Sequence, residues 1–176
     1  MTAKEAFQYV SSGGADDFER VITICEKTGP YCLVGGLAVN CYVEPVYTLD
    51  ADLVVHVNYL AKVRDLLMEA GFSIEDHPYL INAQAPQSQL RIQFTKDPRY
   101  QSFVARAAVK EVLGQQVKVA SLSDLVQGKI WAWADQKRRL SKRQKDQADL
   151  VRLAETYPEI QNVLPPEIQK LFRSTL

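Results

Sequence analysis

Two glycines and two aspartates in the first third of the sequence have the types and spacing needed for chemistry on a phosphate. Gly35 and Gly36 follow an apolar run, and Asp50 and Asp52 precede another. Glycine lets a phosphate approach the backbone closely, and a helix that begins just after it offers free N–H groups. Two aspartates at this spacing on an extended segment leave the same face, about 6.6 Å apart along the strand, and can converge on one or two magnesium ions. Together they predict a site for a nucleoside triphosphate with magnesium.

Each half of this pattern also has an ordinary structural explanation. A glycine pair most often marks a turn, and two aspartates at this spacing are common in loops and at strand ends. What favours the site is the order of the elements, because strand, glycine turn, helix and acidic strand follow one another between Tyr31 and Val57. Neither half alone is specific, and the prediction rests on their combination.

The composition indicates an ordinary globular protein. The 176 residues are enough for one domain with a core, and apolar residues make up 47% of them. Lys and Arg together number 21, as do Asp and Glu, so the zero net charge gives no general attraction to nucleic acids or membranes. No apolar run approaches the ~20 residues that span a bilayer, and the N-terminal residues lack the apolar core of a signal peptide. We therefore expect a cytoplasmic protein without membrane contact.

Cysteine and histidine are too scarce to suggest a site. Cys25, Cys32 and Cys41 have no metal-type spacing, and we expect reduced, mostly buried thiols. His56 and His77 have no partner cluster in the sequence. These observations argue against a histidine-ligated zinc ion and against a Ser-His-Asp site.

Apolar periodicity and turn residues divide the first 120 residues into helices and strands. Helices are expected at Ala3–Val10, from Asp16 or Asp17 to Gly29, and at Gly36–Tyr42, Asn58–Ala70 and Tyr100–Ala108. Strands are expected at Tyr31–Val34, Asp52–Val57, Phe72–Leu80 and Leu90–Thr95, with a hairpin at Val109–Leu113 and Val117–Ala120. The polar stretch Ile81–Gln89 predicts a loop.

The remainder of the chain is expected to be helical. Ser121 or Ser123 can cap a helix to about Leu140, and a basic connector leads to a second helix that ends near Tyr157. Pro165-Pro166 begins a last short helix. The sequence thus predicts an α+β fold, in which residues 1–120 form a mixed β-sheet core flanked by helices. Residues 121–176 form a helical extension packed on that core as one structural unit.

Two charged residues lie on apolar faces of these helices. Lys129 falls within the stripe of the first helix, and Asp146 continues the stripe of the second. Because burial of an unpaired charge is costly, each needs a partner or a polar cavity. The two either pair with each other or point at bound phosphate and metal. Asp149 lies nearer the flank of its stripe, where a cap partner, a surface charge and a site residue are all open.

A basic segment joins the two helices. Six of the nine residues of Lys137–Lys145 are Lys or Arg, against a net charge of zero for the whole chain. Such a run is usually a solvated connector. The alternative is a phosphate-binding surface for a nucleotide or a nucleic acid.

Three segments of the sequence resemble motifs of the AbiEii/AbiGii-type nucleotidyltransferases, a branch of the polymerase-beta-like superfamily. The first family motif is an apolar strand, two small residues, a helix and Thr-x-Asp-x-Asp, and it is similar to VGGLAVNCYVEPVYTLDADLVV. The second, an acid-Leu-x-x-x-Lys helix, resembles SLSDLVQGKIWAW. The third, Lys-Asp-x-x-Asp-Leu, resembles KRQKDQADLVRL.

This resemblance implies roles for particular residues. Gly35, Gly36, Thr48, Lys129 and Lys145 would bind the nucleoside triphosphate, and Lys129 would neutralise its charge. The metal ligands for Mg²⁺ or Mn²⁺ would be Asp50 and Asp52. Asp146 would act near the attacking hydroxyl or orient the lysine.

The resemblance also implies a reaction and partners. A nucleoside monophosphate would pass from the triphosphate to an acceptor hydroxyl on RNA or tRNA, a protein or a small molecule. The family includes toxins of bacterial toxin–antitoxin and phage-defence systems, so a cognate antitoxin protein is a further expected partner.

The sequence departs from the superfamily pattern on the acceptor side. Many members carry a third carboxylate on a later strand, and Gln93 stands where that acid is expected. Glutamine is neither a base nor an anionic ligand. Asp97, four residues on and expected on the same strand face, is a weak substitute, and Val46 replaces a frequent arginine. Two further hypotheses thus stay open: a nucleotide-binding or partner-binding module that has lost transfer activity, and an antitoxin-like protein that contacts another chain.

Overall fold

A mixed β-sheet forms the centre of the protein, and the computed structural model describes residues 1–173. Its strands are β1 (Tyr31–Val34), β2 (Asp50–Val55), β3 (Ser73–Asp76), β4 (Leu80–Gln84), β5 (Arg91–Thr95), β6 (Ala108–Val112) and β7 (Gln115–Val119). Within the described residues the sheet has seven strands, in the order β3-β4-β5-β2-β1-β7-β6. Strand β2 is antiparallel to β1 and parallel to β5. The two central strands are therefore the ones that carry the glycine and aspartate motif.

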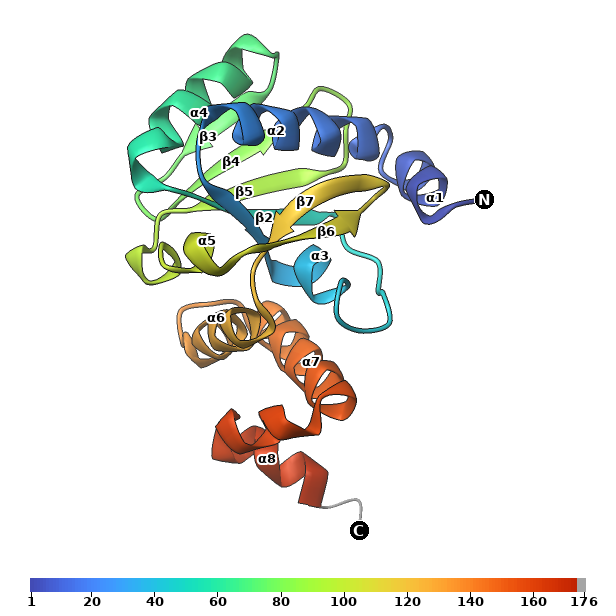
Figure 1. Cartoon of the computed structure of the whole chain (residues 1–176), viewed down its shortest axis with the longest axis vertical. Coiled ribbons are helices and arrows are strands. Elements are labelled where there is room, and N and C mark those ends of the chain that lie inside the picture. The colour runs from blue at the N-terminus through green and yellow to red at the C-terminus, as the bar shows by residue number, and fades with distance from the viewer. Residues whose placement is uncertain (174–176) are drawn as a thin grey trace.

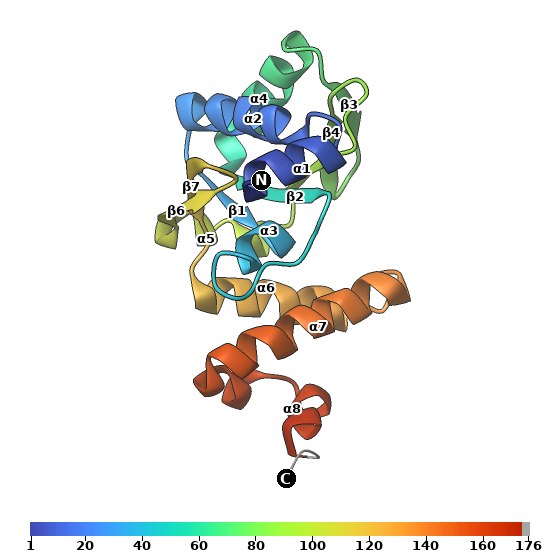
Figure 2. The ribbon, with the colours of Figure 1, turned by 90° about the vertical axis from the view of Figure 1, so that its right-hand side faces the viewer.

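Helices cover the sheet on both sides. They are α1 (Ala3–Val10), α2 (Gly14–Thr28), α3 (Gly35–Val39), α4 (Val57–Glu69), α5 (Phe103–Arg106), α6 (Leu122–Ala134), α7 (Leu140–Thr156) and α8 (Pro166–Arg173), with 3₁₀ turns η1 (Pro98–Tyr100) and η2 (Pro158–Val163). Figures 1 and 2 show α2 and α4 on one side of the sheet and α3, α6 and α7 on the other, with α8 farthest from it. This arrangement confirms the α+β fold expected from the sequence. Among the helices of residues 1–173, none is long and apolar enough to cross a membrane.

The buried residues follow the periodicities of the sequence. On α2, the residues Phe18, Val21, Ile22 and Cys25 recur at helical spacing and are all buried. All four residues of β1 are buried, as expected for a strand covered on both faces. Burial raises the pKa of the Cys25 thiol to about 12, so this cysteine is a core residue.

One hairpin differs from the sequence-based expectation. Strands β3 and β4 replace the single strand expected at Phe72–Leu80, and β4 occupies the first residues of the expected loop Ile81–Gln89. Ile81 and Ala83 are buried and alternate with polar residues, which is the pattern of a half-buried strand. The polar partners in that alternation gave the segment its loop-like composition.

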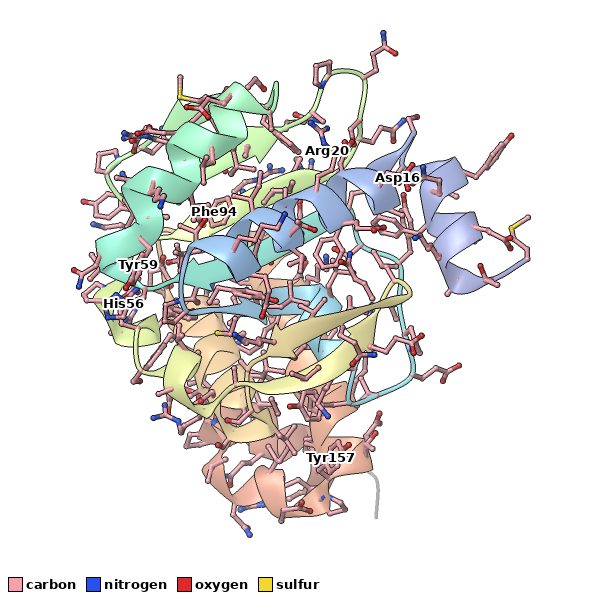
Figure 3. The ribbon with its side chains drawn as sticks, turned by 45° about the horizontal axis from the view of Figure 1, so that its top comes forward. Asp16, Arg20, His56, Tyr59, Phe94 and Tyr157 are labelled. Atoms are coloured by element: carbon pink, nitrogen blue, oxygen red, sulfur yellow. The ribbon has the colours of Figure 1, made fainter. Side chains whose placement is uncertain are left out.

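A helix cap at the junction and a hydrogen bond from the end of α7 position the helical extension beside the sheet core. Ser121 caps α6 by accepting from the backbone N–H of Asp124 at 3.2 Å, directly after the last strand. The Tyr157 hydroxyl, at the end of α7, donates to the Tyr42 carbonyl oxygen at 3.0 Å. Figure 3 shows Tyr157 among the C-terminal helices. The Tyr42 hydroxyl in turn donates to the Ala120 carbonyl oxygen at 2.8 Å. We therefore propose that residues 1–120 and 121–173 fold as one unit, while residues 174–176 of the expected extension lie outside the described residues.

Coincident unfolding of the two parts is the expected result of urea titration. Both tryptophans lie on α6. Trp131 stacks on Phe103 of the core, and Trp133 packs against an apolar cluster that includes Leu150 and Leu153 of α7. Tryptophan fluorescence thus reports on the helical part, and far-UV circular dichroism reports on the whole chain. A single unit gives the same midpoint with both probes. A fluorescence transition that precedes the dichroism change would show that the extension unfolds independently.

Candidate active site

The glycine turn brings the end of β1 against an aspartate of β2. Val34 pairs with Asp52 across the two antiparallel strands, so Gly35 lies next to the Asp52 carboxylate. Gly35 has a φ of 71°, and a Cβ atom built on it would lie 2.1 Å from Asp52 Oδ2. Only glycine leaves room for that carboxylate in this backbone conformation. Gly36 is the first buried residue of α3. A Cβ atom built on it would lie 3.6 Å from Thr48, which is an ordinary contact distance.

Alanine substitutions at three glycines separate backbone strain from this close approach. Gly71 also has a positive φ but no atom within 4 Å of a built Cβ, so Gly71→Ala is expected to cost about 1–2 kcal/mol for strain alone. Gly35→Ala adds the clash with Asp52 and should cost clearly more. Gly36→Ala should be close to neutral. Urea midpoints of the three variants test this order, and equal midpoints for Gly35→Ala and Gly71→Ala would contradict it.

Asp50 and Asp52 lie on the same side of β2 but have different surroundings. Asp50 is 8% exposed, and both of its carboxylate oxygens are bound by cations. Arg91 Nε lies 2.7 Å from Oδ1, and Lys142 Nζ lies 2.8 Å from Oδ2. Burial acts to raise the pKa of Asp50, but the hydrogen bonds from Lys142 and Arg91 outweigh it and hold the pKa below its ordinary value. Asp50 is therefore ionised.

Asp52 has no hydrogen bond or ion pair with any residue in the described range 1–173. Burial raises its pKa, and the nearby charges of Lys129, Arg138 and Lys142 offset that only in part. A half-buried carboxylate without a partner is costly, because desolvation is not repaid by a hydrogen bond. Asp52 is thus available to bind a ligand.

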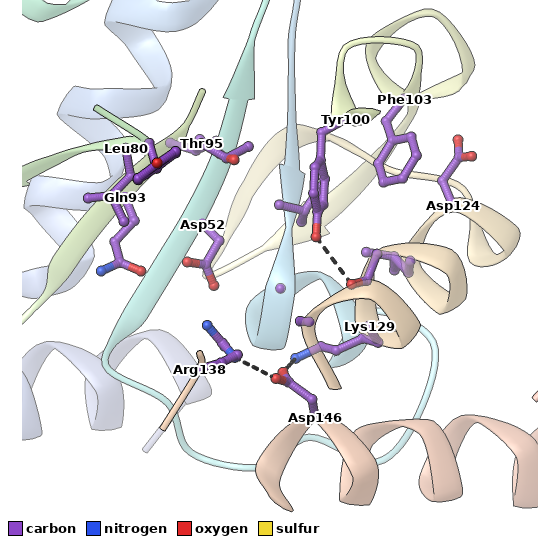
Figure 4. Close-up of a pocket in the computed structure, with 17 residues that line it drawn as sticks. Asp52, Leu80, Gln93, Thr95, Tyr100, Phe103, Asp124, Lys129, Arg138 and Asp146 are labelled. Atoms are coloured by element: carbon purple, nitrogen blue, oxygen red, sulfur yellow. Dashed lines mark hydrogen bonds and ion pairs between the residues drawn. The ribbon is translucent and has the colours of Figure 1, made fainter. Parts of the chain in front are cut away.

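A cavity of about 190 Å³ opens beside Asp52, between the sheet and α6. Figure 4 shows Asp52 and Gln93 on one side of it, Lys129, Arg138 and Asp146 on another, and Tyr100 and Phe103 on a third. The Tyr100 hydroxyl donates to the Gly128 carbonyl oxygen at 3.1 Å, which fixes this aromatic wall to α6. The cavity therefore combines an apolar wall with charged groups of both signs.

Lys129 links the two C-terminal helices through buried carboxylates. Its Nζ lies 3.1 Å from Asp146 Oδ1 and 2.7 Å from Asp149 Oδ2. Burial acts to lower the pKa of Lys129, but the charges of Asp149 and Asp146 outweigh it and the pKa is raised. Lys129 is thus a cation that lines the cavity and is also paired. Of the two alternatives left open by the sequence, the pairing of Lys129 with Asp146 is confirmed, and a contact of Lys129 with bound phosphate stays a prediction.

Asp149 is a buried member of this network. It is 2% exposed and is held by Lys129 and by Arg152, whose NH1 lies 2.8 Å from Asp149 Oδ1. A surface charge, one of the options for Asp149, is therefore wrong. Asp146 and Asp149 are three residues apart on α7 and therefore lie on the same face, from which both reach Lys129.

The basic segment is a connector, and three of its residues, Arg138, Lys142 and Lys145, also contact residues of the candidate site. Arg138 Nε lies 2.8 Å from Asp146 Oδ2, and Lys145 Nζ lies 3.2 Å from Thr48 Oγ1. Lys142 holds Asp50, whereas Lys137 is exposed. Arg91, Arg138 and Lys142 had not been singled out from the sequence. The available signal was the spacing of Lys142, Lys145, Asp146 and Asp149, which places all four along one side of α7.

The acceptor side of the cavity has an amide where an acid was expected. Gln93 of β5 pairs in register with Asp52 of β2 and with Asn82 of β4. Its Nε2 donates to Asn82 Oδ1 at 3.1 Å. Gln93 therefore does lie beside Asp52, where a third carboxylate would be near the metal ligands.

No other acid takes the place of Gln93 among the cavity-lining residues that the structure describes. Asp97 lies beyond the end of β5, where it caps η1 and pairs with Arg99 at 2.7 Å, so its expected place on the strand face is wrong. Asp124 lines the cavity and was missed in the sequence, but Arg106 binds both of its oxygens at 2.8 and 2.9 Å. A free base on the acceptor side is not formed by these residues.

The carboxylates of the site suit a metal ion that is also coordinated by the phosphates of its substrate. Within residues 1–173 no group of three or more Asp, Glu, His or Cys side chains converges as a metal site. His56 instead caps α4, beside Tyr59 (Figure 3), and His77 lies near Glu75. Magnesium in phosphate-transfer sites is commonly held by one or two carboxylates and by substrate phosphates. Asp50 and Asp52 fit that arrangement, with Asp52 as the unpaired ligand.

A family profile matches most of the chain. The profile of the nucleotidyl transferase AbiEii toxin, described as a type IV toxin–antitoxin system, matches residues 20–176. No curated protein matches the sequence closely enough to count as a relative.

Solved structures of the same fold include an antibiotic-resistance factor and an antibiotic adenylyltransferase. The antibiotic-resistance factor ANT(2'')-Ia in solution has a TM-score of 0.62 and 14% identity, over 93% of both chains. The lincomycin-bound lincosamide adenylyltransferase LnuA has a TM-score of 0.52 and 15% identity, over 87% of this chain and 98% of its own. A nucleotidyltransferase-like protein from Paracoccidioides brasiliensis has a TM-score of 0.52 and 19% identity, over 85% and 75%. At these identities the likeness shows a shared nucleotidyltransferase fold.

Proposed function

Since this chain belongs to the AbiEii nucleotidyltransferase family, we propose that it transfers a nucleoside monophosphate from a nucleoside triphosphate to an acceptor hydroxyl. The observation that carries the proposal is the position of Asp52. This unpaired carboxylate lines the cavity, lies against Gly35, and shares a strand face with Asp50. An anionic group of this kind, held ready without a partner, suits a magnesium–triphosphate complex.

The donor half of the site is the better supported one. We assign the triphosphate to the space between Gly35 and Lys129, with Gly36, Thr48 and Lys145 on the side of α3. Asp50 and Asp52 would hold Mg²⁺ or Mn²⁺, which when bound neutralises phosphate charge and orients the α-phosphate. The acceptor oxygen attacks the α-phosphorus, and the bond to the bridging oxygen of pyrophosphate breaks. Catalysis is then mainly positioning and charge stabilisation.

The acceptor half is less complete and favours a second candidate. Gln93 is neutral, and Asp146 is already bound by Lys129 and Arg138. Neither is a free base for an acceptor hydroxyl. The alternative is therefore a nucleotide-binding or partner-binding module that has kept the donor half and lost transfer.

Labelled nucleotides distinguish these two candidates. Purified protein is incubated with Mg²⁺ or Mn²⁺, each of the four α-labelled nucleoside triphosphates, and three acceptor pools: total RNA including tRNA, cell protein, and aminoglycoside or lincosamide antibiotics. We expect label on one acceptor with release of pyrophosphate. Metal-dependent nucleotide binding without label on any pool would favour the binding module. Absence of both binding and label would refute the proposal.

The biological part of the proposal follows from the family. We propose that the protein acts in the bacterial cytoplasm as the toxin of a toxin–antitoxin or phage-defence system, with a cognate antitoxin protein as partner. Induced expression of the wild type should then arrest growth. Expression of the Asp52→Asn variant should not, and equal growth of the two strains would count against a toxin role.

A further inference from the structure

Both oxygens of Asp50 are occupied by cations that come from distant parts of the chain. Arg91 is the first residue of β5 and lies beside Asp50 in the parallel pairing with β2. Lys142 lies on the first turn of α7. A metal ion bound to either oxygen would lie close to one of these cations, and the repulsion between the like charges favours displacement of that cation.

The helix position of Lys142 is unfavourable in itself. The N-terminal end of a helix carries a partial positive charge, so a lysine there is repelled rather than stabilised. The first turn of α7 has no acidic residue to compensate. The contact with Asp50 supplies a negative charge that stabilises Lys142, and an anion bound near this end of α7 would supply one as well.

We propose that Arg91 and Lys142 form a cation clamp, which neutralises Asp50 in the absence of substrate and is displaced when metal and nucleotide enter together. On displacement Lys142 pairs with an oxygen of the triphosphate. This inference rests on the proposed function, because it concerns the same site. It assigns to Lys142 a contact with the nucleotide and to the pair a preference for the metal–nucleotide complex over the free ion.

The charges of the surrounding network support this preference. Six cations take part: Arg91, Lys129, Arg138, Lys142, Lys145 and Arg152. Four carboxylates oppose them: Asp50, Asp52, Asp146 and Asp149. Among these ten groups two positive charges are in excess, so a bare divalent cation adds to the imbalance. A metal–triphosphate complex is anionic and removes it.

The two clamp residues have room to release Asp50. The side chain of Arg91 is 56% exposed and that of Lys142 is 38% exposed, whereas that of Asp50 is 11% exposed. A lysine head group on a flexible four-carbon stem can change partners without a movement of the backbone. The exchange therefore requires only side-chain rotation in the part that faces solvent.

Opposite changes in two affinities test the clamp. Binding of free Mn²⁺, and of Mn²⁺ with the α,β-methylene analogue of the best-bound nucleoside triphosphate, is measured by electron paramagnetic resonance and calorimetry. Lys142→Met should bind free Mn²⁺ about tenfold more tightly and the Mn²⁺–nucleotide complex about tenfold more weakly, the change expected for one charge contact. Lys137→Met is the matched control, because Lys137 is exposed and its side chain has no hydrogen bond or ion pair with the described residues 1–173; its backbone N–H donates to Asp135. Its two affinities should equal those of the wild type.

The other outcomes separate the clamp from the proposed function. If the wild type binds the Mn²⁺–nucleotide complex and Lys142→Met behaves like Lys137→Met, the clamp is wrong and the proposed function stands. If Lys142→Met weakens both affinities together, its effect is structural and the clamp is again wrong. A wild type that binds neither free Mn²⁺ nor the complex overturns the proposed function and the clamp with it. Urea midpoints of both variants establish that each is folded.

Discussion

The Asp52→Asn variant is expected to lose transfer activity and to be more stable than the wild type at neutral pH. Metal-ion stabilisation of the transferring phosphate is worth several kcal/mol, so loss of an anionic ligand should lower the rate at least about a hundredfold. The stability should change in the other direction. Burial raises the pKa of Asp52, and the described residues give its carboxylate no ion pair, so the charge opposes folding. Asparagine has the same shape without that charge. Activity is measured with labelled nucleotide, and stability by urea unfolding.

Asp50→Asn is the matched control, with the opposite expected effect on stability. Its carboxylate is held by Arg91 and Lys142, and its pKa is lowered, so the ionised form favours folding. Removal of the charge leaves two cations without their partner. Both variants should lose activity, but only Asp50→Asn should be destabilised. Equal destabilisation of the two would show that Asp52 has a partner in the folded protein.

The pH dependence of the Asp52 effect has a definite sign. A carboxyl with a raised pKa binds its proton more tightly in the folded state than in the unfolded state. Its unfavourable contribution is therefore present at neutral pH and disappears as the pH falls through the raised value. The stability advantage of Asp52→Asn over the wild type should shrink as the pH is lowered. An advantage that grows on acidification would contradict the assignment.

The Lys129→Met variant is expected to lose about 3 kcal/mol of stability. Removing one partner of a buried ion pair leaves the other charge buried and uncompensated, which typically costs 3–5 kcal/mol. Here Lys129 is 8% exposed, and Asp146 and Asp149 are each 2% exposed. The lower end of that range applies because Arg138 and Arg152 remain as partners of the two carboxylates. The measurement is the free energy of unfolding in urea.

The same substitution at an exposed ion pair provides the comparison. Lys4 lies 3.3 Å from Glu19, and the two side chains are 40% and 53% exposed. Lys4→Met should cost less than about 1 kcal/mol. Similar losses for the two variants would mean that the network around Lys129 does not contribute as a buried pair. A partial recovery on adding Asp149→Asn to Lys129→Met would confirm that the unpaired carboxylate is the cause.

Much of the fold was predictable because its signals are local. The apolar run Tyr31–Val34, the glycines after it and the acidic strand follow one another in an order that is informative as a whole, although no part is specific alone. Helix α6 begins where Ser121 can cap it, as expected, but it ends at Ala134 rather than near Leu140. The residues that follow form a turn instead, in which Asp135 accepts hydrogen bonds from the backbone N–H groups of Lys137 and Arg138.

The pairing of charges was not predictable, because it depends on how strands and helices are placed. Asp50 and Asp52 have the same residue type on the same strand face, yet one has two partners and the other none. Arg91 reaches Asp50 only through the register of β5 on β2. Asp97 was expected on the strand face because side chains alternate between the two faces of a strand. Strand β5 ends at Thr95, so this alternation does not extend to Asp97. One neighbour was predicted correctly, because Gln93 does lie beside Asp52 in the sheet.

The contact between Lys142 of α7 and Asp50 of β2 determines when the candidate site is complete during synthesis of the chain. The bond from Lys142 to Asp50 joins residues 92 positions apart, and the Lys129 network is made entirely after residue 120. A nascent chain that has emerged only as far as β7 holds both β2 aspartates without these cations. The ribosome must therefore extend the chain through α7 before the site exists. A chain that stops earlier is expected to be inactive.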